Sequence, residues 1–361
     1  MNSLIAERLN RPRDSETKPT RLILKILTMR VFQKPRLICL AIAYAAACLA
    51  AMSCIKDDQS DCTLELRLRY VYNMQEADGL AREADEADVY VFDSENKFVG
   101  HYSAQNIGEE NFTMHLPLPE PGRYTFVAWA KSTKETNPEA NFEITEPQKR
   151  DDSPESLTAR IRRNRGCAKS RLNNLLNGTL ETEVSGANRK LTIDLMKCTN
   201  AIRIILMPSH PGQTLKCEDF DISIEGKNGW LGYDASTYRT DTLIYYPYRQ
   251  LLERSSEGKS GDEIDNAVTA DFNTSRILDG SNARLVVRNA SSGREILNIN
   301  LPWFLSLQAI GEHRAEWTNQ EYPDRQDEYS MTFFIDGATW METKIVVNGW
   351  VLSLQEIDFS K

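Results

Sequence analysis

The sequence predicts an all-β protein built from two tandem β-sandwich domains. Short runs that alternate apolar and polar residues, with the period of a strand, recur from residue 63 to residue 354. Turn-forming residues separate these runs. Residues 75–88 suggest a short helix or connection, and in the second half only residues 302–317 look helical. About 300 residues follow an amino-terminal export signal, which favours two cores over one. We therefore place a domain boundary between residues 198 and 199.

The first predicted domain covers residues 62–198 and opens with a strand over 63–72. Apolar runs at 89–92 and 98–102 predict a hairpin, because a polar gap of turn length joins them. Strands over 112–118 and 124–129, joined by a Pro-Gly turn, suit the edge of a sandwich. The residues of the first strand expected to face the core are Leu64, Leu66, Leu68, Tyr70 and Tyr72. Residues 131–190 show no clear pattern.

The second predicted domain covers residues 199–361. A strand over 191–195 closes the first domain, and one over 201–206 opens the second. Its further strands are expected over 220–225, 242–246, 283–288, 296–301, 329–335 and 343–347. At the end, the β-run Val347, then Asn348 and Gly349, then Trp350, Val351 and Leu352 indicate two strands split by a turn. This terminal strand either sits in its own sheet or lies at an exposed edge, where the strand of a neighbouring subunit could pair with it. The region is therefore a candidate subunit contact.

The amino-terminal segment has the order of a lipoprotein signal peptide. Basic residues precede sixteen uncharged, mostly apolar residues at 37–52, and small Ser53 then leads to Cys54. A spanning helix needs about 20 apolar residues, so this run favours a cleaved signal over an uncleaved anchor. We predict a signal over residues 1–53, with Met29 as an alternative start, and a lipidated tether over 54–61. Cys48 is a competing lipid site, but it would leave apolar residues at the head of the tether.

The residues after the lipid-site cysteine suggest surface export. Lys56, Asp57 and Asp58 resemble the lysine-plus-acidic signal that directs lipoproteins of Bacteroidota to the cell surface. An ordinary solvated tether explains the same residues. The sequence leaves both alternatives open.

Charge argues against nucleic acid as a partner. The whole chain has a net charge of −9, and residues 54–361 hold 34 basic and 49 acidic residues. Such a surface repels phosphate backbones. Basic clusters at 149–150 and 160–165 are expected to be solvated surface, although a protease that recognises basic residues could cut there.

No motif of catalytic or metal chemistry is present in the sequence. The four histidines lie at no metal-ligand spacing, and no nucleophile elbow or phosphate loop occurs. Trp230, flanked by glycines, is the best candidate for a sugar platform, but a buried plug is the favoured interpretation. We expect no enzyme activity, cofactor or metal. Cys62, Cys167, Cys198 and Cys217 would remain after lipidation, and their pairing stays open, with no bridge or one bridge favoured over two.

Together, the segment from Cys54 to Cys62, the strand into residues 70–74, the run 89–93 and the closing residues 347–350 resemble the FimB/Mfa fimbrial anchor family of Bacteroidota. The resemblance implies two transthyretin-like β-sandwich domains in a non-enzymatic lipoprotein at the base of a type V pilus. Its implied partners are the fimbrial stalk subunits, joined by strand addition, and the outer membrane, reached through lipid on Cys54. A surface lipoprotein that binds glycan or host protein, or a tip adhesin, is the alternative.

Overall fold

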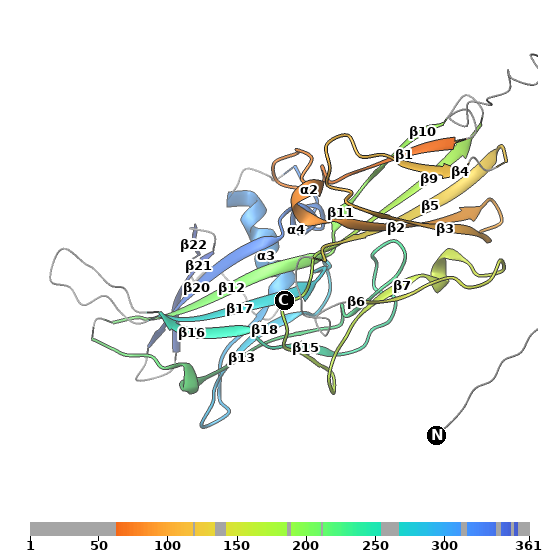
Figure 1. The fold of residues 1–361 in the computed structure, drawn as a ribbon. Coiled ribbons are helices and arrows are strands. Elements are labelled where there is room, and N and C mark those ends of the chain that lie inside the picture. The colour runs from red at the N-terminus through yellow and green to blue at the C-terminus, as the bar shows by residue number, and fades with distance from the viewer. Residues whose placement is uncertain are drawn as a thin grey trace, which may run out of the picture. The chain divides into compact units, whose positions relative to one another are not determined.

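Almost all regular structure in the protein is β, which confirms the predicted fold class (Figure 1). The computed structural model describes residues 63–117, 120–133, 142–185, 189–210, 212–253, 267–311, 316–336, 341–347 and 350–352. Within these ranges the strands form five sheets.

Two sheets enclose the first core. One has the order β10 (Lys190–Asp194), β1 (Thr63–Arg69) and β4 (Met114–Pro117). The other has the order β11 (Met196–Lys197), β9 (Leu175–Val184), β5 (Gly122–Lys131), β2 (Glu86–Asp93) and β3 (Phe98–Gln105). The alternation predicted for the first strand is confirmed, because Leu64, Leu66, Leu68 and Tyr70 are all buried. The strand ends at Arg69, however, and Tyr72 lies beyond it, with its ring under the Arg325 guanidinium.

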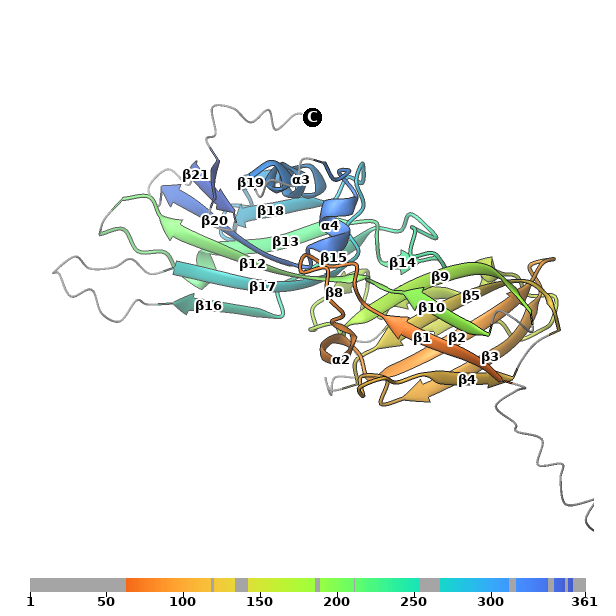
Figure 2. The ribbon, with the colours of Figure 1, turned by 90° about the horizontal axis from the view of Figure 1, so that it is seen from above.

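Two further sheets enclose the second core. The six-stranded one has the order β16 (Arg249–Glu253), β17 (Ala267–Ser275), β12 (Thr199–Pro208), β20 (Glu328–Asp336), β21 (Met341–Val347) and β22 (Trp350–Leu352). The five-stranded one has the order β19 (Glu295–Asn300), β18 (Arg284–Asn289), β13 (Phe220–Gly226), β15 (Leu243–Tyr245) and β8 (Cys167–Ala168). Figure 2 shows α3 (Leu301–Gly311) beside β18 and β19, and its Leu301, Phe304 and Leu305 enter this core.

The remaining sheet has the order β14 (Trp230–Leu231), β7 (Thr158–Ile161) and β6 (Phe142–Thr145). Its residues pack with Tyr90, Phe92, Val127 and Trp129 in a third apolar cluster. Strand β5 is therefore buried on both faces and is the middle strand of its sheet, so the predicted edge position for residues 124–129 is wrong. The α-helices α2 (Leu80–Glu83) and α4 (Glu321–Arg325) and the 3₁₀ turns η3 (Pro154–Ser156) and η4 (Cys217–Asp219) complete the described elements.

The segment predicted as a domain boundary is buried. Lys197 extends its ammonium to Glu83 at 2.8 Å and to Asp327 at 2.5 Å, and all three side chains are largely enclosed. Cys198 is 0% exposed, and its N–H donates to the Leu175 carbonyl. Residues 62–361 form one compact unit. The division into domains at 198/199 therefore stays a prediction.

Glycine at position 178 is required by close packing within the first core. A Cβ there would lie 2.6 Å from the carbonyl oxygen of Asp194, which is backbone and cannot rotate away. We expect Gly178→Ala to lower the free energy of unfolding by about 1–3 kcal/mol, as overpacking does. Gly122→Ala, whose nearest neighbour would be 3.6 Å away, is the control on the paired strand β5. Urea denaturation measures both, and equal losses would contradict this packing argument.

Candidate functional site

Some of the predicted site residues lie outside the described residues. These are Cys54, Lys56, Asp57 and Asp58 of the lipid tether and Asn348 and Gly349 of the terminal turn. Cys62 also lies outside. Lipidation and surface export therefore stay predictions.

The carboxyl-terminal strands form the expected hairpin. Val347 pairs with Trp350, Val346 with Val351, and Ile345 with Leu352. Strand β22 ends the six-stranded sheet, and among the described strands none pairs with its outer side. The sequence left open whether the terminal strand sits in its own sheet or lies at an exposed edge. Strand β22 does both, because it belongs to the six-stranded sheet and is its last strand.

A second pair of sheet edges without a partner among the described strands lies at β3 and β4, next to the first core. These strands follow one another in the chain, yet β3 ends the five-stranded sheet and β4 ends the three-stranded one (Figure 2). A cavity of about 460 Å³ lies between them, lined by His101–Ala104 and by Phe112–Leu116. Within the described part of the chain neither strand has a partner on its outer edge. We call this cavity the β3–β4 groove.

The groove opens onto apolar side chains of the core. Tyr102, Ala104 and Phe112 are only partly buried, although they pack against the first core. By contrast, the inward residues of the neighbouring strand β2, such as Val89 at 0% exposed, are fully covered. The core is therefore incompletely covered along β3. An added strand with apolar residues at alternate positions would cover it, while its backbone pairs with a free sheet edge.

Sequence reasoning did not single out the residues of this groove. Alternation in 98–102 and 112–118 identifies which side chains face inward, but it does not reveal which strand ends a sheet. That depends on pairings between segments far apart in the chain, such as β1 with β10. The groove became visible only when the pairing order was known.

A cluster of Asp88, His101 and Ser103 on the β2–β3 hairpin does not have the geometry of a catalytic triad. Both Asp88 Oδ1, at 3.0 Å, and Ser103 Oγ, at 3.2 Å, approach the same ring nitrogen, His101 Nε2. A triad needs the carboxylate on one ring nitrogen and the nucleophile on the other. Ser103 instead donates to Asp88 Oδ1 at 2.6 Å, and the imidazole stacks on Tyr90. The burial of Asp88 is outweighed by hydrogen bonds from Ser103 and His101, which hold the pKa of its carboxyl below the usual value.

Trp230 is covered on its faces and is not an open sugar platform. The guanidinium of Arg160 lies 4.6 Å from the Trp230 ring centroid, and that of Arg239 lies 5.1 Å from it. The ring centroid of Tyr238 is 5.2 Å from that of Trp230. The interpretation as a buried plug therefore fits better than a binding surface.

Among the described residues, the requirements of a metal site, a membrane-spanning helix and a disulfide are not met. No group of three or more His, Cys, Asp or Glu side chains there has the arrangement of a metal site. Among the helices described, none has the length and apolar character needed to span a bilayer. Cys167, Cys198 and Cys217 are free thiols, and complete burial raises the pKa of Cys198 to about 12.

The fold defines an all-β protein with two sheet-enclosed cores and with sheet edges that have no partner among the described strands. A family model described as fimbrillin-A associated anchor proteins Mfa1 and Mfa2 matches residues 59–356. The chain belongs to this family. Membership implies association with fimbrial subunits and a place at the cell surface or envelope.

Several solved structures share the fold of this chain. A putative polysaccharide binding protein of Bacteroides thetaiotaomicron is 28% identical, with a TM-score of 0.70 over 82% of this chain and 99% of that one. A putative adhesin of the same organism is 25% identical, with a TM-score of 0.70 over 81% and 98%. The fimbrial anchor protein Mfa2 of Porphyromonas gingivalis shares the fold at 17% identity, with a TM-score of 0.61 over 81% and 98%. The comparison with curated proteins gave no match.

Proposed function

We propose that this chain is a non-enzymatic lipoprotein that anchors a type V pilus to the outer membrane. Lipid on Cys54 would hold the protein at the membrane, since each buried CH₂ contributes about 0.8 kcal/mol and a bacterial lipoprotein carries several acyl chains. The tether over residues 54–61 would leave the β-structure free to meet a stalk subunit. Lys56, Asp57 and Asp58 would direct the lipoprotein to the outer face of the membrane.

We propose further that the stalk subunit joins by strand addition at the β3–β4 groove. The observation that carries this proposal is that two sheet edges without a partner among the described strands meet over partly exposed core residues. Main-chain hydrogen bonds to an edge give affinity, and pockets for alternate side chains give specificity. The edge of β22, beside Val347, is the other candidate, and separate variants at the two edges distinguish them.

A second function, the binding of glycan or host protein by an adhesin, is favoured by the names of two relatives. One is called a putative polysaccharide binding protein and the other a putative adhesin. The covered faces of Trp230 remove the one aromatic platform that the sequence singled out for this alternative. The anchor role is therefore the better supported one.

Mass spectrometry of the native protein tests the lipid attachment. We expect the mature amino terminus to be Cys54 carrying a diacylglycerol group, and the Cys54→Ser variant to leave the membrane fraction. Cys48→Ser is the matched control and should stay in the membrane. An unmodified Cys54 in wild-type protein, or membrane release by Cys48→Ser, would contradict the proposed site.

A further inference from the structure

The segment 160–171, which includes the connection between β7 and β8, is strongly basic although the protein as a whole is acidic. Residues 160–171 contain six Arg or Lys and no Asp or Glu, although the chain as a whole carries a net charge of −9. The stretch lines a cavity of about 720 Å³, which is within the size range of small-molecule sites. Four of the lining residues are cationic, namely Arg162, Arg163, Arg165 and Lys169.

The backbone of this connection is fixed by hydrogen bonds. Asn164 and Cys167 exchange both backbone bonds, at 3.0 and 2.9 Å, around two residues with positive φ, Arg165 at 49° and Gly166 at 81°. This is the conformation of a type I′ hairpin turn. The following strand β8 pairs with β15, so the turn is attached to a sheet. The cations are therefore presented by a preformed structure, which lowers the entropic cost of binding.

The four cations differ in how far their charge is already engaged, and Arg162 has an interaction partner of its own. Asp241 pairs with Arg163, whose side chain is only 10% exposed, and also lies 3.6 Å from Arg160. Arg165 has no acidic partner among the described residues. Lys169 likewise has none there and instead places its ammonium 4.4 Å from the centroid of the Tyr246 ring. The cavity thus keeps the positive charge of Arg165 and Lys169 available to a ligand.

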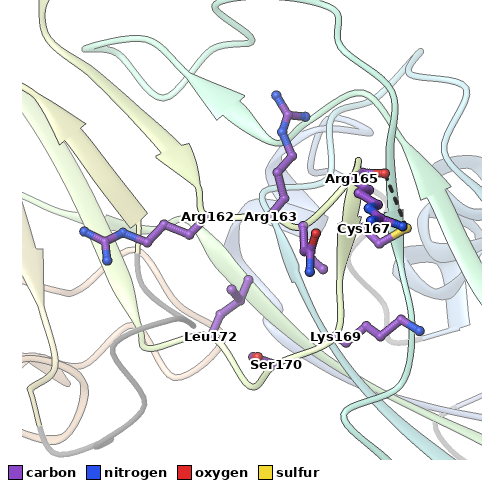
Figure 3. Close-up of a pocket in the computed structure, with 9 residues that line it drawn as sticks. Arg162, Arg163, Arg165, Cys167, Lys169, Ser170 and Leu172 are labelled. Atoms are coloured by element: carbon purple, nitrogen blue, oxygen red, sulfur yellow. Dashed lines mark hydrogen bonds between the residues drawn. The ribbon is translucent and has the colours of Figure 1, made fainter.

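The arrangement of the side chains indicates the kind of ligand. Figure 3 shows Arg162, Arg163 and Lys169 extending in different directions around the cavity instead of converging on one point. Since Arg163 is already paired with Asp241, a ligand would meet mainly the charges of Arg165 and Lys169. Two separated cations suit a ligand with more than one anionic group. The apolar lining residues Ala168 and Leu172 are buried at 7% and 4% exposed, so the cavity lacks the accessible apolar anchor on which protein partners depend. Asn164 and Ser170 offer hydrogen bonds to hydroxyl groups.

We infer that this cavity binds an acidic polysaccharide, one that carries sulfate or uronate groups. Arginine forks match the planar or tetrahedral oxygens of such groups, and the polar lining matches sugar hydroxyls. The site is separate from the proposed strand-addition groove and does not depend on the anchor role. Binding is expected to weaken as salt rises, because the contacts are electrostatic.

Binding measurements on the purified full chain test this inference. The probes are a sulfated heparin oligosaccharide, an oligogalacturonate, neutral dextran, a poly-glutamate peptide and oligothymidylate, each titrated by calorimetry. We expect at least one of the two acidic saccharides to bind, and dextran, the peptide and the oligonucleotide to bind much more weakly. Since charged hydrogen bonds are the strong ones, Arg165→Glu/Lys169→Glu should weaken saccharide binding by at least about tenfold.

Arg123→Glu/Lys190→Glu is the matched control, because it makes the same charge change at two exposed sites in the first two sheets. It should alter saccharide affinity less than about twofold, in line with the small energies of surface charges. If the reversal variant has a lowered melting midpoint, Arg165→Gln/Lys169→Gln replaces it, with the same expected loss. Failure of both acidic saccharides to bind, equal losses in both variants, or tighter binding of the peptide or oligonucleotide would each overturn the inference. The test uses isolated protein, so it is independent of whether fibres are anchored on cells.

Discussion

Cells that carry Ala104→Arg in this chain are expected to release their fibres. Ala104 faces inward from β3 and lines the β3–β4 groove. A guanidinium there would occupy the space needed by an added strand, or would have to be buried without a partner when that strand inserts. A penalty of about 3 kcal/mol, the lower end of the cost of an unpaired buried charge, corresponds to roughly a hundredfold loss of affinity.

Immunoblotting of stalk subunits in cells and culture medium measures this release. Val99→Arg is the matched control, since Val99 lies on the same strand and is 38% exposed. It should leave the fibres on the cells. Urea denaturation of both variants checks that they remain folded. Fibres that stay attached with folded Ala104→Arg would exclude the groove, and a parallel Val351→Arg variant would then test the edge of β22.

Lys197→Met is expected to give the largest loss of stability. The ammonium of Lys197 bridges Glu83 and Asp327, and the side chains of Lys197 and Glu83 are 9% and 6% exposed. Methionine would leave two enclosed carboxylates without their shared cation. Removing one partner from a buried ion pair typically costs about 3–5 kcal/mol.

Urea denaturation measures this loss, and Lys190→Met is the control. Lys190 pairs with Glu65 at 3.0 Å, but its side chain is 82% exposed, so its replacement should cost less than about 1 kcal/mol. Equal losses in the two variants would show that the Lys197 network contributes no more than a surface pair.

The same network predicts a dependence on pH. Burial opposes ionisation of Glu83, but hydrogen bonds and charge from Lys197 and Arg82 outweigh it and hold the pKa of the Glu83 carboxyl below its usual value. A carboxyl with a lowered pKa in the folded state stabilises the fold above its unfolded pKa, and this stabilisation is lost as pH falls through the folded pKa. The difference between wild type and Lys197→Met should therefore shrink in acid. A difference that stays constant with pH would contradict this role for Glu83.

Local patterns predicted most strands, because period-two alternation reports which side chains share a face. The hairpin of β2 and β3 and the inward residues Leu64, Leu66 and Leu68 were found in this way. Residues 131–190, which show no clear pattern, contain β6, β7, β8 and β9. Of these, β7, β8 and β9 pair with β14, β15 and β5, which lie far away in the chain. Alternation carries no information about such distant pairing.

The candidate sites were harder to predict than the strands. Lys197 lies between the strands predicted over 191–195 and 201–206, and its burial depends on Glu83 and Asp327, which are distant in sequence. The basic run 160–165 is predicted to be solvated surface, and Arg162 and Arg165 are indeed exposed, but the sequence does not reveal that the run lines a cavity. In both cases the decisive contacts are tertiary.

Electron microscopy of fibres on cells tests the central claim, that a lipidated β-protein holds the pilus at the membrane. Cells lacking this chain should shed their fibres or carry abnormally long ones, and the wild-type gene should restore normal attachment. Complementation with Cys54→Ser should fail to restore it. Normal, attached fibres on cells lacking the chain would contradict the anchor role.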